Sequence, residues 1–431
     1  MASNVYFLHS RNGGLGHYIR LGHTGYRKLE DLQAADRLPI ASAIVEANHA
    51  VNQTDLTRAL KASGVELILD PKTGELGTVG GFSTGARRLP WANPSRPHKP
   101  DDFIPAQLAG FCDRIVEFAM IHQVDVVHAP THFITSAFDP WTDVDNRACL
   151  ELRDALDRQG GQRVRIDYPI ITSYEVFRDE GFRQALISQL NGLPFDNLWL
   201  RISGFGMSAT PAGVMRYIEA AWSLQELNHP IVADGVAGLA GLALCAFGAV
   251  GGVSHGIAGK DSFNHRDWLK TREDGGGSTS RIYLPNIDMY LYSDQAEVLF
   301  RNRGAKSLLG CNDSSCCPNG FRDMFDHSKA HALTQSARLL EALNGTPQTN
   351  WVDHYLNRQL GPAGLTARKL VAIALNDDKL AERLRKQNKR LDLMSRALED
   401  LRSDIDAAPQ AKKPAKRTIS PVPQHLDGPR L

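Results

Sequence analysis

The stretch RIDYPIITSYEVFRDEGFRQALISQLNGLPFDNLWLRIS, residues 165–203, decides the fold class. It begins with the apolar run RIDYPIITS (165–173) and ends with the apolar run NLWLRIS (197–203), and a helical segment near 178–191 lies between them. Short apolar runs rich in Ile, Leu and aromatic residues are typical of buried strands. Two such strands joined by a helix predict a parallel β-α-β unit, because parallel strands need a crossover between them.

The same alternation extends from this unit in both directions. Further strands are expected at 41–47, 65–70, 124–130, 230–234 and 248–255, with 305–310 as the eighth. Eight units over about 270 residues predict an α/β fold of the (β/α)₈ TIM-like barrel type, whose usual length is about 250 residues. A doubly wound open sheet is the alternative. The GGLGH segment (13–17) lies between a further strand candidate, not counted among these eight, and a poorly helical segment, and it is a weak phosphate-loop signal.

Composition narrows the class of protein. The chain has 431 residues, of which 42% are hydrophobic, and its formal net charge is +1, so nucleic-acid binding would need a local basic patch. The start lacks the pattern of a secretory signal, and the longest apolar stretch (230–255) contains Asp234 and many glycines, so no membrane span is expected. We therefore expect a cytoplasmic protein with reduced thiols.

Polar residues end several of the expected strands. In a TIM barrel the C-terminal ends of the strands face the active site. We expect Asp70, His255 and Asp261, which lies in the loop after His255, to act in catalysis. The expected substrate-binding residues are His128, Arg201, Asp234, Gly204, Gly206, Gly251 and Gly252. Each has a structural alternative, since an Asp can cap a helix, a His can bond to backbone and a Gly can permit close packing.

The loop GCNDSSCCPNG (310–320) holds half of the six cysteines. Cys311, Cys316 and Cys317 with one imidazole would form a closed structural zinc site, with His331 as the expected fourth ligand and His327 or His354 as alternatives. The C-x₄-C-C spacing departs from the usual C-x₂-C. A cluster of reduced thiols or a redox site therefore remains an alternative.

The chain divides into three expected parts. We assign residues 1–376 to the barrel, including a zinc subdomain at about 305–360, residues 377–406 to an amphipathic helix, and the basic, Pro-rich residues 407–431 to a disordered tail. The helix has a heptad pattern, which predicts packing on the domain, homodimerisation through a coiled coil, or a nucleic-acid arm. The heptad positions are Leu384, Leu391, Leu398 and Ile405 with Leu380, Gln387, Met394 and Leu401.

These segments together resemble the tRNA-guanine transglycosylase-like superfamily. That family is a (β/α)₈ barrel with a zinc subdomain of three Cys and one His after the eighth strand. The segment LILDPKTGEL lies where the family has an Asp-Ser-Gly-Gly loop and matches its Asp at Asp70, and the Phe195-Asp196 pair with Gly204 and Gly206 resembles its Phe-Asp-Gly turn and glycine-rich strand. PIVADGVAGLAGLALCAFGAVGGVSHG resembles the next two strands, and HSKAHALTQSARLLEAL resembles the helix after the cysteines.

The resemblance implies an enzyme that exchanges a base through a carboxylate nucleophile at the end of the seventh strand. Counting 248–255 as that strand places Ser254 and His255 there instead of an Asp. The leading hypothesis is therefore a transglycosylase-like enzyme acting on a nucleobase or nucleoside in nucleic acid, with tRNA or DNA as partner. The alternatives are a barrel enzyme for a small anionic metabolite, with Arg201 holding a phosphate or carboxylate, and a non-catalytic binding barrel.

Overall fold

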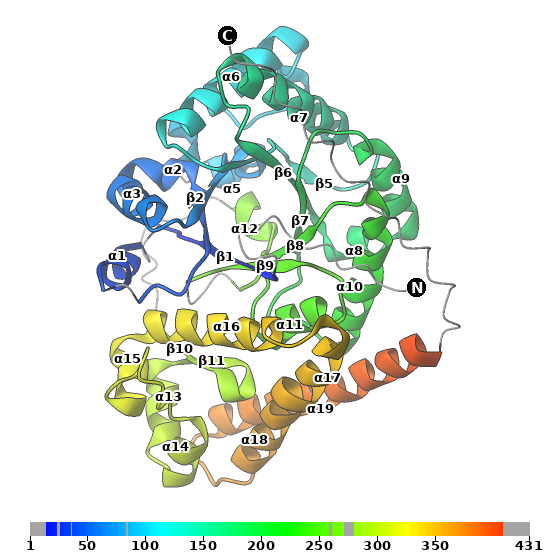
Figure 1. Ribbon diagram of the computed structural model, residues 1–431. Helices are drawn as coiled ribbons and strands as arrows, with labels where there is room; N and C mark the ends of the chain where they lie inside the picture. Colours follow the sequence, from blue (N-terminus) through cyan, green and yellow to red (C-terminus); the bar gives the residue numbers. More distant parts are fainter. Residues whose placement is uncertain are drawn as a thin grey trace, which may run out of the picture.

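Eight parallel strands close into a barrel with helices between them, a TIM barrel (Figure 1). The computed structural model describes residues 14–23, 26–35, 37–82, 85–257, 261–270 and 280–407. Pairing of β1 with β9 and of β4 with β6 closes the ring. The barrel strands are β1 (Gly16–Arg20), β2 (Ser42–Glu46), β3 (Glu66–Asp70), β4 (Val126–His128), β6 (Arg165–Ser173), β7 (Asn197–Ser203), β8 (Ile231–Asp234) and β9 (Gly252–Gly256).

The structure corrects the count of strands at both ends of the barrel. The first strand is β1, which pairs with β2, so Gly16 and His17 belong to a strand and not to a phosphate loop. The expected eighth strand at 305–310 is instead part of the helix α14 (Arg303–Leu309). The Asn302 side chain caps this helix by accepting from the backbone N–H groups of Gly304 and Ala305. The last barrel strand is therefore β9, and β8 is the seventh.

Helices cover the outside of the ring. Their apolar faces pack on the outward-facing side chains of the strands and form the main core. The long ones are α1 (Tyr26–Ala34), α3 (Thr54–Ala62), α6 (Pro105–Ile121), α7 (Pro140–Arg158), α9 (Glu180–Leu190), α10 (Pro211–Leu224) and α11 (Gly238–Ala246). Shorter elements are α2 (Ala47–Ala50), α4 (Thr73–Leu76), α5 (Val79–Phe82), α8 (Tyr174–Phe177), α12 (Arg266–Leu269) and β5 (Phe133–Ile134), which pairs with β6.

The inside of the barrel contains a separate apolar layer. It is a cluster of buried side chains from six strands: Tyr18, Ile44, Ile68, Val126, Trp199 and Val232. Side chains alternate between the two faces of a strand, so the residue two positions further along each of these strands also points inward. This layer is the floor on which the polar side chains at the C-terminal end of the barrel rest.

A helical region follows the barrel and carries the cysteine loop. It starts with the hairpin of β10 (Arg281–Leu284) and β11 (Met289–Tyr292). The later helices are α13 (Ser293–Phe300), α14, α15 (Asp323–Asp326), α16 (Ser328–Asn344), α17 (Trp351–His354), α18 (Gly361–Val371) and α19 (Asp378–Ala407). The α16 helix packs on α11 and α1, which joins this region to the barrel (Figure 1).

The heptad segment forms α19, which packs against α18 and α10. Its buried side chains are Leu380, Leu384, Leu391, Met394, Leu398 and Leu401. The face expected to pair with a second copy is therefore covered within the chain, and packing on the domain is the observed use of the pattern. The basic tail beyond Ala407 lies outside the described residues.

Every helix in the part of the chain that the structure describes is too short or too polar to cross a bilayer.

Candidate functional site

A ring of polar side chains lies inside the C-terminal end of the barrel. Each member stands two residues after a member of the inner apolar layer, and each is buried. The ring consists of Arg20, Glu46, Asp70, His128, Arg201 and Asp234. Strand alternation places all six on the inner face at one level. Four predicted residues, Asp70, His128, Arg201 and Asp234, are thus brought together.

Two arginines bridge two carboxylates at the centre of this ring. The guanidinium of Arg20 lies 2.5 Å from Asp70 Oδ2 and 3.0 Å from Asp234 Oδ2. The guanidinium of Arg201 lies 3.0 Å from Asp70 Oδ2 and 2.6 Å from Asp234 Oδ2. The Ser254 hydroxyl donates to Asp234 Oδ1 at 2.8 Å. Every charge in this group of four is paired twice, which is what burial of charged groups requires.

The arginines keep both carboxyl groups ionised. Burial alone would raise the pKa of each group, but the neighbouring guanidinium groups outweigh it. The pKa of Asp70 is held well below its ordinary value, and that of Asp234 falls to about 2. Both carboxyl groups are therefore ionised at neutral pH.

A second ion cluster extends the ring toward the loop after β3. The buried Lys72 ammonium lies 3.0 Å from Glu46 Oε1 and also contacts Glu75. Although burial opposes the charge, Glu46 and Glu75 raise the pKa of Lys72. Lys72 has a left-handed backbone (φ 61°), and its N–H donates to Asp70 Oδ1 at 2.9 Å. This conformation, unusual for a residue with a side chain, fixes both Lys72 and Asp70.

His128 faces a small cavity with both ring nitrogens buried and without a hydrogen-bond partner among the described residues. Burial lowers the pKa of His128 to about 4, so the ring is neutral at pH 7. Asp70, Lys72 and Arg201 also line the cavity, whose volume of about 10 Å³ has room for one water molecule. A buried imidazole without partners is costly, which marks this cavity as a place for a ligand or water.

Residues 261–270, called the strap below, cross over this end of the barrel. At one side Phe263 forms a bridge with Ser203 at the end of β7, and the Gly204 N–H donates to Phe263 O at 3.0 Å. At the other side the Trp268 ring lies against Gly74, which follows β3 three strands away around the ring. The α12 turn of the strap lies within the ring of strands in Figure 1. The strap therefore covers the polar ring.

His255 does not join Asp70, which corrects the expected arrangement. Ser254 points into the barrel, so the next residue along β9 points outward. His255 Nε2 lies 2.9 Å from His17 Nε2, and both rings face α11 and α16. Asp70 and His255 consequently occupy opposite sides of the barrel wall.

Asp261 and the four predicted glycines are also separate from the ring. Asp261 begins the strap and lines a different, larger pocket beside the barrel. A Cβ added at Gly206 would lie 2.4 Å from Ser262 Cβ, so this glycine permits the strap to approach. Gly204 has a left-handed backbone (φ 87°). Gly251 and Gly252 lie in the β9 region, where the Gly251 carbonyl accepts from the Gly16 N–H.

Sequence reasoning missed three members of the polar cluster. Arg20 was missed because the strand GHYIR is short and polar, and Glu46 because it ends a run that was taken only as a strand. Lys72 was missed because it stands in a loop. A charged residue at the last position of the strand was the available signal for Arg20 and Glu46, whereas nothing local marks Lys72 as buried.

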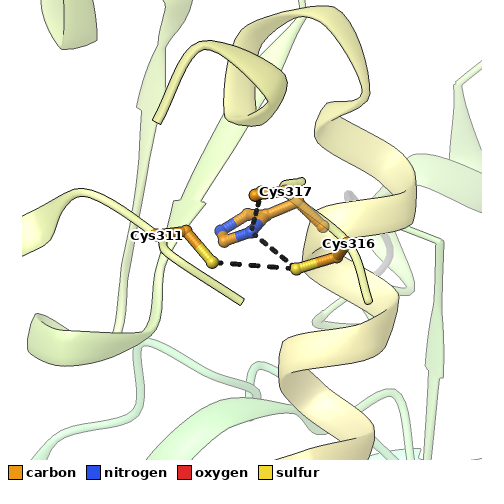
Figure 2. A group of neighbouring side chains, drawn as sticks. Cys311, Cys316 and Cys317 are labelled. Atoms are coloured by element: carbon orange, nitrogen blue, oxygen red, sulfur yellow. Dashed lines mark hydrogen bonds between the residues drawn. The ribbon is translucent and has the colours of Figure 1, made fainter. Parts of the chain in front are cut away.

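The three clustered cysteines converge on the His331 imidazole (Figure 2). Cys311 Sγ lies 3.7 Å from Cys316 Sγ, and His331 Nδ1 lies 3.6 Å from Cys316 Sγ and 3.4 Å from Cys317 Sγ. With Zn–S bonds of ~2.3 Å and Zn–N bonds of ~2.0 Å, a tetrahedral ion would hold sulfurs ~3.8 Å apart and sulfur and nitrogen ~3.5 Å apart. The donor set and its spacing fit such an ion.

The surroundings of this cluster support a metal site. The adjacent Cys316 and Cys317 both reach it because their N–H groups bond to Asp313 O in a tight turn. His331 Nε2 lies 3.0 Å from Tyr283 O, which orients Nδ1 toward the sulfurs, as is common for metal-binding imidazoles. His354 instead bonds to Thr346. The geometry selects His331 as the fourth donor.

Comparison with known proteins identifies no family. No family model and no curated protein matches the chain. Similar solved structures include a GH18 chitinase from Pseudoalteromonas aurantia (13% identity, covering 59% of this chain and 97% of that chain, TM-score 0.36). A further example is xylanase 10B from Thermotoga maritima (10% identity, covering 56% of this chain and 81% of that chain, TM-score 0.34). Another is type I 3-dehydroquinate dehydratase from Clostridium difficile (8% identity, covering 62% of this chain and 94% of that chain, TM-score 0.35). Similarity at these identities and TM-scores carries no argument about function.

Proposed function

We propose that the chain is a transglycosylase-like enzyme that acts on a nucleobase or nucleoside in nucleic acid, by base exchange or glycosyl cleavage. The observation that carries the proposal is the pair of ionised carboxylates, Asp70 and Asp234, inside the C-terminal end of the barrel. Such chemistry needs a carboxylate to trap or stabilise the sugar C1′ centre as the base departs.

The corrected strand count strengthens the resemblance to the tRNA-guanine transglycosylase-like superfamily. That family has its nucleophilic Asp at the end of the seventh barrel strand. Because β1 is the first strand, β8 is the seventh, and it ends with Asp234. Asp70 ends the third strand, where the resemblance places the family's other Asp. With this count Ser254 and His255 belong to the eighth strand, so their lack of an Asp no longer speaks against the proposal.

The proposed reaction assigns a role to each group. An Asp234 oxygen bonds to C1′ as the bond from C1′ to the leaving base breaks, and the base keeps the electron pair and takes up a proton. A nitrogen of the new base, or a water oxygen, then bonds to C1′, releases a proton and frees Asp234. Neutral His128 can accept a proton at one ring nitrogen while donating from the other, so it can relay these protons through water.

The Cys₃His cluster supports the same proposal. It follows the last barrel strand, as the resemblance implies, and we propose that it holds a structural Zn²⁺. The ion would tie the loop 311–317 to α16 through Cys311, Cys316, Cys317 and His331.

The two other functional classes are less well supported by the ring itself. Each of Arg20, Lys72 and Arg201 already has carboxylate partners, so the ring is poorly suited to a phosphorylated metabolite. The separation of His255 and Asp261 from Asp70 would favour a non-catalytic barrel. Catalysis is favoured instead by the meeting of Asp70 with Asp234 and by His128, whose ring has no hydrogen-bond partner among the described residues.

The test is incubation of the purified protein with tRNA or duplex DNA and radiolabelled guanine. We expect label to enter the nucleic acid, and a covalent protein–nucleic acid adduct to survive on a denaturing gel. Asp234→Asn should abolish both, whereas Asp55→Asn, at an exposed carboxylate, should not. An adduct formed equally well by Asp234→Asn would reject Asp234 as nucleophile, and absence of binding to tRNA and DNA at low salt would reject the nucleic-acid substrate.

A further inference from the structure

A second pocket near the strap lies beside the barrel and outside the polar ring. Its volume is about 400 Å³, within the range of small-molecule sites. It is enclosed by the loop after β7, the start of the strap, the β10–β11 hairpin and α19. Its ionisable side chains include Arg281, Arg383, Arg390, Asp261 and Asp288.

Residues 383–390 of α19 contain five basic residues, Arg383, Arg385, Lys386, Lys389 and Arg390, of which two line the pocket and three do not. Arg383, Gln387 and Arg390 are spaced by four and three positions, and all three line the pocket. Arg385 and Lys386 point away from it and pair with Glu382 at the surface. The basic cluster seen in the sequence is therefore not one continuous patch, because two of its cations face a concave site.

Two of the three pocket arginines already form hydrogen bonds or an ion pair within the protein. Arg390 donates to Met207 O and Ala209 O and pairs with Asp288 at 3.2 Å, which ties α19 to the barrel loops. Arg383 donates to Gln295 and Tyr290 O. Arg281 is different, because it is exposed and, within the described part of the chain, its guanidinium stacks on Tyr292 and has no carboxylate partner.

Asp261 supplies a second polar group to the pocket. Its Oδ1 atom is buried and has no hydrogen-bond partner among the described residues. Burial raises the pKa of Asp261 to about 7, so the carboxyl can accept or donate a hydrogen bond near neutral pH. With three arginines against two carboxyl groups, the pocket carries a net positive charge.

We propose that this pocket binds a phosphate ester, with Arg281 and Arg383 contacting the phosphate oxygens and Asp261 bonding to a hydroxyl or N–H group of the same ligand. Arginine presents several N–H donors in a planar fork that matches phosphate oxygens. The ester is a free nucleotide or a backbone phosphate of a nucleic acid, which share this chemistry. The inference does not depend on glycosyl transfer, because the pocket lies outside the barrel interior.

The test is isothermal titration of the full chain with inorganic phosphate, GMP and a single-stranded octanucleotide, at low salt. We expect GMP or the octanucleotide to bind, and Arg281→Gln and Arg383→Gln each to weaken that binding about tenfold. Arg385→Gln removes the same charge from the other face of α19 and should change affinity less than about twofold. Asp261→Asn should weaken the binding of GMP more than the binding of inorganic phosphate.

The results distinguish a free nucleotide from a nucleic-acid backbone as the ligand, and they can also show that the pocket is not a phosphate-binding site. Binding of GMP indicates a free nucleotide, and binding of the octanucleotide alone indicates a nucleic-acid backbone. Equal losses in Arg385→Gln and Arg281→Gln would overturn the proposal, because they would show general charge attraction. Absence of binding by all three probes would overturn it as well. Thermal unfolding of Arg281→Gln checks its folding, which should be unchanged since the side chain is exposed.

Discussion

Replacing Arg20 with Met should destabilise the protein strongly and in a pH-dependent way. Arg20 contacts three buried carboxylates, Asp70, Asp234 and Glu46. Without it, Arg201 and Lys72 are the cations among the described residues that still contact Asp70, Asp234 and Glu46, so Asp70 and Asp234 each lose one of their two arginine partners. Removing one partner from a buried ion network costs about 3–5 kcal/mol, because the remaining charges stay buried without compensation. We expect a loss of that size in the free energy of unfolding at pH 7.

The pH dependence follows from the depressed pKa values. In the folded wild type, the pKa of Asp234 is about 2 and that of Asp70 is well below its ordinary value. The stability that they contribute is present above the unfolded pKa of ~4 and is lost as the pH falls through the folded pKa. Without Arg20 the folded pKa values rise, so both groups take up protons in mild acid. The deficit of Arg20→Met should therefore shrink between pH 8 and pH 5.

Urea unfolding followed by circular dichroism across that pH range measures both effects. The control is Arg58→Met, which removes an arginine whose side chain is 74% exposed and should cost less than ~0.5 kcal/mol. A loss below ~1 kcal/mol at pH 7, or a deficit that stays constant down to pH 5, would refute the electrostatic account of the ring.

Three further predictions concern the metal, the strap and a second buried carboxyl. Metal analysis of protein purified with zinc present should find about one zinc per chain, lost in Cys316→Ser and Cys317→Ser, and a metal-free wild type would contradict this. Gly80→Ala places a Cβ 2.1 Å from Lys270 O and should displace the strap, which would be measured as faster hydrogen exchange in residues 261–270. The control Gly364→Ala adds a Cβ where there is open space and should leave this exchange unchanged. Burial raises the pKa of Asp167 to about 7, so the folded state keeps a proton that the unfolded chain has lost, and stability falls as the pH rises from ~4 to ~7. Asp167→Asn should reduce this slope in urea unfolding, and an unchanged slope would show that another group causes it.

Local sequence patterns predicted the barrel and part of its ring. Strands such as RIDYPIITS and NLWLRIS are buried on both faces, so most of their consecutive residues are apolar. Such a run can be recognised from the sequence alone. Asp70, His128, Arg201 and Asp234 were predicted because each ends or nearly ends such a run. The strand count went wrong at the short, polar strand GHYIR and at the short helix RGAKSLL, whose end AKSLL was taken for a strand.

The sequence by itself determined the alternation of strands and helices, the polar strand ends and the cysteine cluster, because these depend on neighbours in the chain. The tertiary structure alone decided that Arg20 bridges Asp70 and Asp234, which are 50 and 214 positions away from it. It also decided that His255 faces outward and that two of the five basic residues at 383–390 of α19 line the pocket beside the barrel. A closed ring sets which strands meet and which side chains point inward, and a shift of one residue in a strand reverses the direction of every side chain in it.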